Sequence, residues 1–192
     1  MGNLESARIM PPKASKYLIE LYAGPGAGKS TLAADLFAHL KKKGLEVELV
    51  REYVKDWVWE NRTILPGDQA YICAKQCRKE RILLGKADII ITDAPTGLAE
   101  LYEEIHEPEP YIVPAMVQKH RELVEERGYR YRQIFVRRGS EYNPTGRWHT
   151  EKQAHELDER ILRWLDRGFR NIYMFDQGVD PLTKIEDLLN LP

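Results

Sequence analysis

A glycine-rich segment at residues 23–31, AGPGAGKST, holds the residues whose types and spacing most directly predict chemistry. Glycines accept positive φ angles and let the backbone approach a ligand, so successive N–H groups can point into one hollow. The N-terminus of a following helix adds partial positive charge. The spacing G-x-x-x-x-G-K-[ST] places a lysine on the β- and γ-phosphates of a nucleotide and a hydroxyl on Mg²⁺. We therefore predict that ATP binds along Gly24, Pro25, Gly26, Ala27, Gly28, Lys29, Ser30 and Thr31.

The alternative is a glycine-rich corner between a strand and a helix that binds nothing. The motif starts at Ala23 where the usual pattern has glycine, a departure that we regard as tolerated. Lys29 and Ser30 follow Gly28, an apolar run precedes the segment, and a helical pattern follows it. A simple corner requires none of these features. The segment therefore favours a nucleotide site, with Lys29 on the phosphates and Ser30 on the metal.

Asp93 is the second candidate metal ligand. It ends the apolar run ADIIITD at residues 87–93, which would place its carboxylate beside the phosphate loop. An aspartate in this position can hold Mg²⁺ directly or through water. The alternative is that Asp93 only caps the turn at Pro95. With the phosphate loop upstream, we favour the metal role.

The elements that must position these residues alternate along the chain. Apolar runs predict strands at residues 17–22, 45–53, 87–93, 131–137 and 171–176. Helical spacing and turn signals predict helices at 30–43, 66–86, 114–127, 151–167 and 182–190. Alternating strands and helices predict an α/β protein whose parallel sheet is covered on both faces. Ligands bind such sheets beyond the carboxyl ends of the strands, where the candidate residues fall.

The composition fits one compact domain. The chain has 192 residues, and 29 Lys and Arg balance 30 Asp and Glu, so the net charge indicates neither a nucleic-acid nor a membrane partner. No apolar run approaches the ~18 residues of a membrane span. We expect a flexible leader at 1–16, one domain at 17–192, and two packing thiols, Cys73 and Cys77. We expect a reducing, cytoplasmic location, which is the host cytoplasm if the protein is viral.

The stretch EYVKDW at residues 52–57 suggests the catalytic base. It resembles the deoxynucleoside kinases, in which a Glu precedes a Trp by five residues, although that family usually has Pro where this chain has Tyr53. The segment REYVKDW is also similar to the ribosylnicotinamide kinase domain. The resemblance implies that Glu52 accepts the proton of the attacking hydroxyl and that Trp57 helps to wall the acceptor pocket. The alternative is a surface Glu at a strand end.

Arginines follow the fourth predicted strand. Arg137 and Arg138 leave the strand, and a turn-rich stretch carrying Arg147 leads to a helix that opens at Thr150. This order is similar to the lid of small P-loop kinases, and it implies a lid at about 138–150 that places Arg147 over the transferring phosphoryl group. The planar guanidinium suits phosphate oxygens and stays charged. The alternative is a solvated basic loop.

The chain as a whole resembles the nucleoside and nucleotide kinase-like group of P-loop kinases. That group implies a three-layer sandwich whose parallel strands run in the order 2-3-1-4-5. The stretches YNPTGRWHT and QAHELDERI resemble phage kinases that phosphorylate 5-hydroxymethyluracil in DNA. The basic and aromatic residues 127–138 could follow a DNA backbone. Strand alternation, however, places part of this stretch in the core, and the net charge argues against extended DNA contact.

The sequence therefore predicts ATP-dependent phosphoryl transfer to a hydroxyl of a nucleoside-type acceptor, with DNA bearing hydroxymethyluracil favoured slightly. The alternatives are a kinase of a free nucleoside or nucleotide and a P-loop ATPase that acts as a conformational switch. A GTPase is disfavoured because the chain has no N-K-x-D element and no D-x-x-G after Asp93. The sequence leaves open the acceptor, the choice of ATP over GTP and the oligomeric state.

Overall fold

Five parallel strands form the centre of the structure. The computed structural model describes residues 15–106, 112–139, 142–176 and 181–189, so most of the expected leader lies outside the described residues. The strands pair in the order β2-β3-β1-β4-β5, and every pairing is parallel, which confirms the expected order. Their bounds are β1 Lys16–Tyr22, β2 Val47–Val50, β3 Ile89–Thr92, β4 Tyr129–Val136 and β5 Ile172–Phe175.

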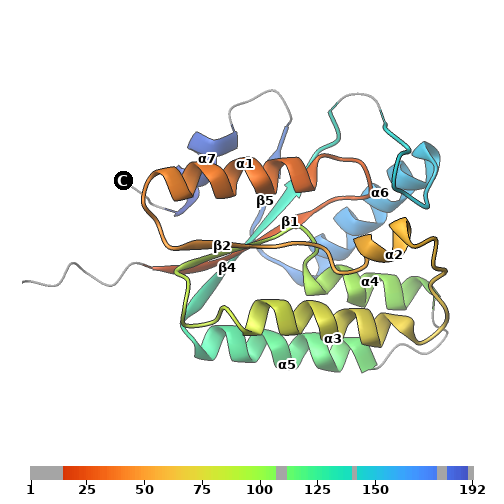
Figure 1. The fold of residues 1–192 in the computed structure, drawn as a ribbon, viewed down its shortest axis with the longest axis horizontal. Coiled ribbons are helices and arrows are strands. Elements are labelled where there is room, and N and C mark those ends of the chain that lie inside the picture. Colours follow the sequence, from red (N-terminus) through yellow and green to blue (C-terminus); the bar gives the residue numbers. More distant parts are fainter. Residues whose placement is uncertain (1–14, 107–111, 140–141, 177–180, 190–192) are drawn as a thin grey trace, which may run out of the picture.

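Helices cover both faces of the sheet, which gives the expected three layers. In Figure 1, α1 and α7 lie on one face and α3 and α5 on the other. Two shorter helices, α2 and α4, lie toward the end of the sheet to which the strands point, and α6 joins β4 to β5. The helices span α1 Lys29–Lys42, α2 Lys55–Trp59, α3 Asp68–Arg81, α4 Thr96–His106, α5 Ile112–Glu126, α6 Glu151–Gly168 and α7 Pro181–Leu189.

The apolar pattern of the strands explains these layers. All four residues of β3 are buried, as expected for a parallel strand covered on both faces. Along β1, Ile19 packs in the cluster that includes residues of α1 and α7, whereas Leu18 packs with Val124 of α5. Successive side chains of a strand point to opposite faces, so one strand supplies both halves of the core.

Three details differ from the expected elements. β2 ends at Val50, so Glu52 lies in the loop after the strand. Helix α3 runs over Asp68–Arg81 and is shorter than the expected 66–86. Helix α4 was not expected, because Pro-Thr-Gly at residues 95–97 is typical of a turn. Gly97 is required for packing, since a Cβ there would lie 2.5 Å from the Trp164 ring.

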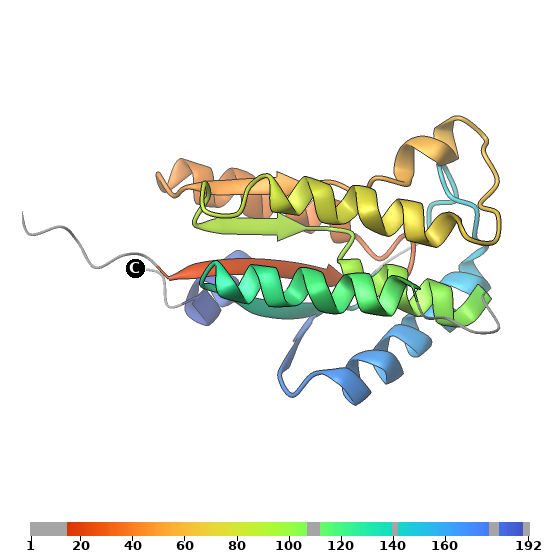
Figure 2. The same ribbon diagram turned by 90° about the horizontal axis from the view of Figure 1, so that it is seen from below.

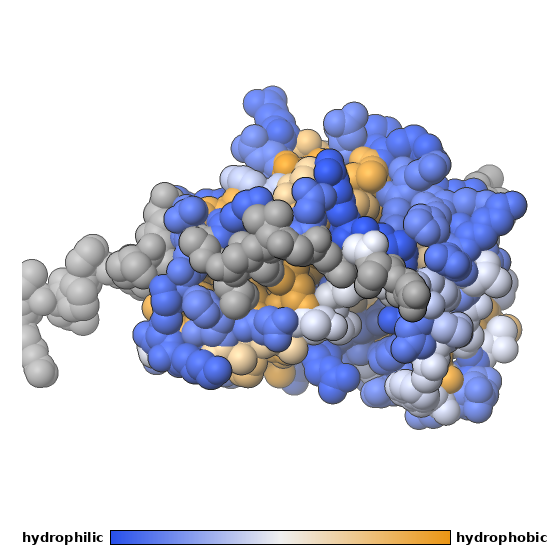
Figure 3. All heavy atoms as spheres, turned by 90° about the horizontal axis from the view of Figure 1, so that it is seen from above, coloured by the Kyte–Doolittle hydropathy of each residue, from blue (hydrophilic) through white to orange (hydrophobic). Residues whose placement is uncertain are grey.

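The carboxyl ends of the strands all lie at one end of the molecule. Figure 2 shows the strands pointing toward the end where α2, the loop after β1 and residues 142–150 gather. On the face above α1, hydrophilic residues cover most of the surface and apolar residues form small areas (Figure 3).

Cys73 and Cys77 are buried free thiols in a cluster with α4 and α5. Among the described residues, no helix is long and apolar enough to cross a membrane.

Candidate active site

The phosphate loop lies between β1 and α1. Gly26 and Gly28 have φ angles of 80° and 90°, a region that favours glycine, and Gly28 is the N-cap of α1. Helix α1 therefore begins at Lys29, and its first turn exposes Ser30 and Thr31 at the mouth of the loop. The free N–H groups of this turn, together with the helix dipole, could bind an anion.

Lys29 lies over its own loop. Its Nζ donates to the carbonyl oxygens of Ala23 at 2.7 Å and Gly24 at 3.1 Å. Burial lowers the pKa of Lys29, while the charges of Glu52 and Asp93 act in the opposite direction. A charged amine next to two carboxylates is the arrangement expected where phosphate and metal are to bind.

Glu52 and Asp93 lie together at the ends of adjacent strands. The register pairs Val50 with Thr92, so the residues that follow them emerge side by side. The backbone N–H of Glu52 donates to Oδ1 of Asp93 at 2.8 Å. Burial raises the pKa of Glu52, and the neighbouring charge of Lys29 partly offsets this. Within the described residues, neither carboxylate forms an ion pair with a lysine or arginine, so both remain available for a ligand.

The oxygen donors of the site fit Mg²⁺. Asp93 is 5% exposed, and within the described parts of the chain only its Oδ1 accepts a hydrogen bond, from the backbone N–H of Glu52. The Ser30 side chain is exposed at the start of α1. A hydroxyl and a carboxylate are hard ligands that suit Mg²⁺, which keeps several waters and needs few protein ligands. The described residues contain no group of three or more His, Cys, Asp or Glu side chains that could hold a metal ion. Among these residues there is therefore no site at which such side chains alone would coordinate a metal.

Arg147 does not join this group. Its guanidinium donates to the carbonyl oxygen of Asn143 and lies 5.6 Å from the Tyr142 ring centroid. No interaction of Arg147 among the described residues reaches the phosphate loop. Arg138 reaches it instead, since Nη1 donates to the carbonyl oxygen of Pro25 at 2.8 Å. The arginine nearest the loop therefore comes from the end of β4, before the segment that carries Arg147.

Asp158 of α6 holds both Arg138 and the loop. Its Oδ2 accepts from Nη2 and Nε of Arg138 at 2.8 and 3.0 Å, and its Oδ1 accepts from the backbone N–H of Gly24 at 2.5 Å. The Tyr142 ring lies so close that a Cβ on Gly26 would be 2.9 Å from it. The contact between Asp158 and Gly24 spans 134 residues, so no local pattern pointed to Asp158.

An aromatic cluster lies directly after Glu52. The rings of Tyr53, Trp57 and Tyr71 have centroids 5.9–6.4 Å apart. Trp57 is buried beneath Arg62, whose guanidinium carbon lies 3.7 Å from the ring centroid, whereas Tyr71 is 47% exposed. Tyr53 stands where the deoxynucleoside kinases usually have Pro, and its ring contributes to this cluster. The open aromatic surface beside Glu52 is therefore mainly that of Tyr71, which the sequence did not indicate.

Helix α2 is also tied to the segment at 142–150. Nζ of Lys55 donates to the carbonyl oxygen of Gly146 at 2.6 Å, and the ring of Trp59 packs on the same glycine. Lys55 also lies 5.5 Å from the Trp59 ring centroid. Although Arg147 is turned away, its segment thus forms one side of the site.

The basic and aromatic residues 127–138 do not form a track for DNA. Tyr129 is buried, and its hydroxyl donates to the carbonyl oxygen of Ala87. Arg132 lies 4.7 Å from the Tyr17 ring centroid, and Arg137 pairs with Asp176. Arg130 pairs in register with Tyr17, near the start of both strands and away from the phosphate loop. The stretch is therefore a central strand whose charges lie at both ends of the sheet.

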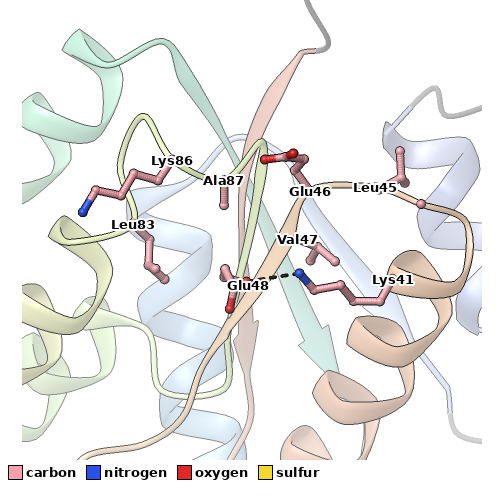
Figure 4. A pocket seen from close by; sticks show the side chains of 9 residues that line it. Lys41, Leu45, Glu46, Val47, Glu48, Leu83, Lys86 and Ala87 are labelled. Carbon is pink, nitrogen blue, oxygen red and sulfur yellow. Dashed lines mark hydrogen bonds and ion pairs between the residues drawn. The ribbon is translucent and has the colours of Figure 1, made fainter.

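A hollow of about 440 Å³ lies at the opposite end of the sheet (Figure 4). Its walls come from the end of α1, the start of β2 and the turn before β3, and Lys41 forms an ion pair with Glu48 in it. None of the predicted site residues lines this hollow. Its position at the amino ends of the strands separates it from the phosphate loop.

Proteins of known structure share this fold. A search of curated proteins finds no significant match. The NadR protein in complex with NR aligns with a TM-score of 0.63 and 14% identity, over 93% of this chain and 53% of that chain. The Mycobacterium tuberculosis APS kinase CysC in complex with AMPPNP and APS aligns with a TM-score of 0.50 and 13% identity, over 92% and 97% of the two chains. APE1195 aligns with a TM-score of 0.50 and 17% identity, over 92% and 95%.

These identities establish the fold alone, which is the three-layer α/β P-loop fold. The family comparison adds a direct sequence match that starts within β1 and extends beyond β5. It therefore includes the phosphate loop and both candidate carboxylates. Because it covers residues 19–178, which is most of the sequence, the chain belongs to the AAA domain family.

Proposed function

We propose that the protein transfers the γ-phosphoryl group of ATP to a hydroxyl group of a nucleoside-type acceptor. The observation that carries this proposal is the meeting of Lys29, Glu52 and Asp93 at the phosphate loop, with an aromatic cluster beside Glu52. Lys29 and the first turn of α1 suit a triphosphate. The aromatic rings suit the planar base of an acceptor.

The transfer is a direct displacement at the γ-phosphorus. The acceptor oxygen forms a bond to phosphorus, the bond to the ADP oxygen breaks, and ADP leaves with the electron pair. Glu52 accepts the proton of the hydroxyl, and its raised pKa brings it closer to the working pH of a general base. Ser30 and Asp93 would hold Mg²⁺, which neutralises phosphate charge. Arg138 would have to shift little to contact the phosphates, because it already lies on Pro25.

Arg147 keeps a role in this proposal only if its segment moves. Its guanidinium now interacts with Asn143 and Tyr142, within its own loop. A phosphoryl group on the loop would offer it a stronger, charge-assisted partner than a carbonyl oxygen. Because Arg138 already lies on the loop and Arg147 would first have to move, transfer should depend on Arg138 more than on Arg147.

A modified base within DNA is the second candidate acceptor. Three large aromatic side chains near the site are well exposed: Trp59 at 61%, Tyr71 at 47% and Trp148 at 41%. Exposed rings that stack on bases are typical of proteins that bind single strands. Residues 127–138 give this candidate no support, since they belong to the sheet. A conformational ATPase is disfavoured because transfer to water requires no acceptor pocket and gives the aromatic cluster beside Glu52 no role.

The test is a transfer screen with γ-labelled ATP against nucleosides, nucleotides and DNA that contains hydroxymethylated pyrimidines. Label should move to a hydroxyl of at least one acceptor, and Glu52→Gln should abolish this transfer. Glu46→Gln is a matched control, because Glu46 lines the distant hollow. Rapid ATP hydrolysis with no labelled acceptor would refute the kinase and support the ATPase.

A further inference from the structure

Positive charge is concentrated around the aromatic cluster in a way that the transfer reaction does not use. Nζ of Lys79 lies 5.6 Å from the Tyr53 ring centroid, and Nζ of Lys75 lies 5.2 Å from that of Tyr71. Together with Arg62 over Trp57, each ring of the cluster has its own cation. The ring centroids lie within 6.4 Å of one another, so the three cations surround one compact group of rings.

In the part of the chain that the structure describes, these cations lack the close ion pairs that several lysines elsewhere form. Lys41, Lys43 and Lys119 each form an ion pair with a carboxylate at 2.5–3.1 Å. Among the described residues, Lys75 and Lys79 form no such pair. Arg62 has only a loose pair with Glu60, at 3.7 Å. The cluster thus gathers three cations, of which only Arg62 has a carboxylate of the described residues within 4 Å.

Intrinsic helix energetics do not account for this arrangement. Lys75 and Lys79 lie four residues apart on α3, where two like charges destabilise a helix. Lys79, in the last turn, gains from the helix dipole, but Lys75 lies too far from that end. Cation–π contact explains how the two lysine side chains are oriented, but it does not neutralise their positive charges. An anion bound at the cluster would balance it.

The cations also lie beside the proposed base. Nζ of Lys79 donates to the carbonyl oxygen of Arg51, the residue before Glu52, at 2.9 Å. Both Lys79 and Lys55 act to lower the pKa of Glu52. An anionic group held by Lys79 would therefore lie a short distance from the hydroxyl that Glu52 deprotonates.

We propose that the acceptor is a nucleotide rather than a nucleoside, and that Lys75, Lys79 and Arg62 bind a phosphate it already carries. The base of this nucleotide lies against Tyr71, and its hydroxyl faces Glu52. The bound phosphate takes no part in the transfer and leaves unchanged. This inference rests on the proposed function and specifies its substrate class. Both a free nucleoside monophosphate and a nucleotide within a DNA strand carry the base, the hydroxyl and the phosphate that this site requires.

The test compares matched acceptors that differ only in phosphate. Each nucleoside is assayed beside its 3′- and 5′-monophosphates and beside a short oligonucleotide that contains it. We expect the kcat/KM for a phosphate-bearing form to exceed that for the nucleoside at least about tenfold, because the cations reject a ligand that leaves them unpaired. Preference for free monophosphates or for the oligonucleotide identifies the source of the phosphate.

The double variant Lys75→Gln/Lys79→Gln should remove this preference, so that within the variant the kcat/KM for the phosphate-bearing form lies within about twofold of the kcat/KM for the nucleoside. The control Lys42→Gln/Lys86→Gln removes the same charge from exposed positions on α1 and near the distant hollow, and it should change neither value. Equal use of nucleosides and monophosphates, or a preference that survives the double variant, would overturn the inference while leaving the kinase intact.

Calorimetry separates binding from transfer. If a monophosphate binds the native protein but not the double variant, the phosphate site is supported. If no transfer accompanies this binding, the kinase is refuted. Neither binding nor transfer with any acceptor refutes both. Transfer to uncharged nucleosides, with no measurable affinity for monophosphates, refutes the phosphate site alone.

Discussion

The backbone N–H of Glu52 donates a hydrogen bond to the carboxylate of Asp93 at 2.8 Å. The bond joins the loops after two neighbouring parallel strands and fixes one oxygen of Asp93, so the other is free to face a metal. It also places two carboxylates next to each other, and the charge of Asp93 contributes to the raised pKa of Glu52. One backbone contact therefore orients the candidate metal ligand and adjusts the candidate base.

Replacing Lys29 by Ala should reduce phosphoryl transfer by several orders of magnitude, because no other lysine could neutralise the phosphates from within the loop. Labelled ATP and the best acceptor from the screen measure this. The circular dichroism spectrum and unfolding midpoint of the variant serve as the folding control. Near-native activity would contradict a nucleotide site at this loop.

Replacing Glu52 by Gln should lower kcat at least about a hundredfold and leave ATP affinity nearly unchanged, since only the base is lost. The native kcat/KM should rise with pH through the raised pKa of Glu52, because the base must be ionised. This rise should therefore lie above the ordinary glutamate pKa. A loss of ATP affinity in the variant would instead assign Glu52 to the nucleotide site.

Asp158→Ala should raise the KM for ATP about tenfold, because the variant frees both Gly24 and Arg138 and the loop loses its fixed geometry. Asp166→Ala, an exposed change on the same helix, is the control.

Arg138→Ala should slow transfer more than Arg147→Ala does. The reverse order would show that the segment at 142–150 moves over the phosphates during turnover.

Gly97→Ala should destabilise the protein by about 1–3 kcal/mol, as expected when a methyl group is forced into a packed core. The added Cβ would lie 2.5 Å from Trp164 and 2.8 Å from the Tyr22 hydroxyl oxygen. Urea unfolding measures the change. Gly168→Ala, where a Cβ meets no atom within 4 Å, should change stability far less. Equal effects of the two substitutions would contradict the close packing of α4 on α6.

Glu20 should make stability depend on pH. Burial raises its pKa to about 7, despite Arg121 and hydrogen bonds from Tyr22 and Gln133, and Glu80 adds to the rise. The folded protein thus binds this proton more tightly than the unfolded chain does. The stabilisation that protonated Glu20 gives the fold is complete below the ordinary glutamate pKa and is lost as the pH rises through 7. The free energy of unfolding changes by about 3 kcal/mol across this range.

Unfolding in urea at pH 5 and pH 8 tests this, with Glu20→Gln as the variant that cannot titrate. The loss of stability between the two pH values should be smaller in the variant by the contribution of Glu20. An identical loss in both proteins would show that Glu20 keeps its charge in the fold. Glu48→Gln, a change at a more exposed carboxylate, is the control.

The parts of the site that follow local patterns were predictable from the sequence. The phosphate loop, the strand order and the position of Asp93 depend on motif spacing, family resemblance and buried apolar runs. Asp158 and Tyr71 were missed because their roles arise from contacts distant in sequence. Helix α4 was missed because its first residues favour a turn. Arg147 was expected at the phosphates on resemblance, and the structure places its guanidinium against Asn143 and Tyr142 instead.

The hydrogen bond from Lys55 to Gly146 connects the acceptor side of the proposed site with its nucleotide side. It links the helix next to the aromatic cluster to the segment between Tyr142 and α6, so neither can shift without straining the other. We expect occupancy of the aromatic side to affect binding on the nucleotide side through this contact. Each ligand should then bind more tightly when the other is present, and the two affinities should change by the same factor.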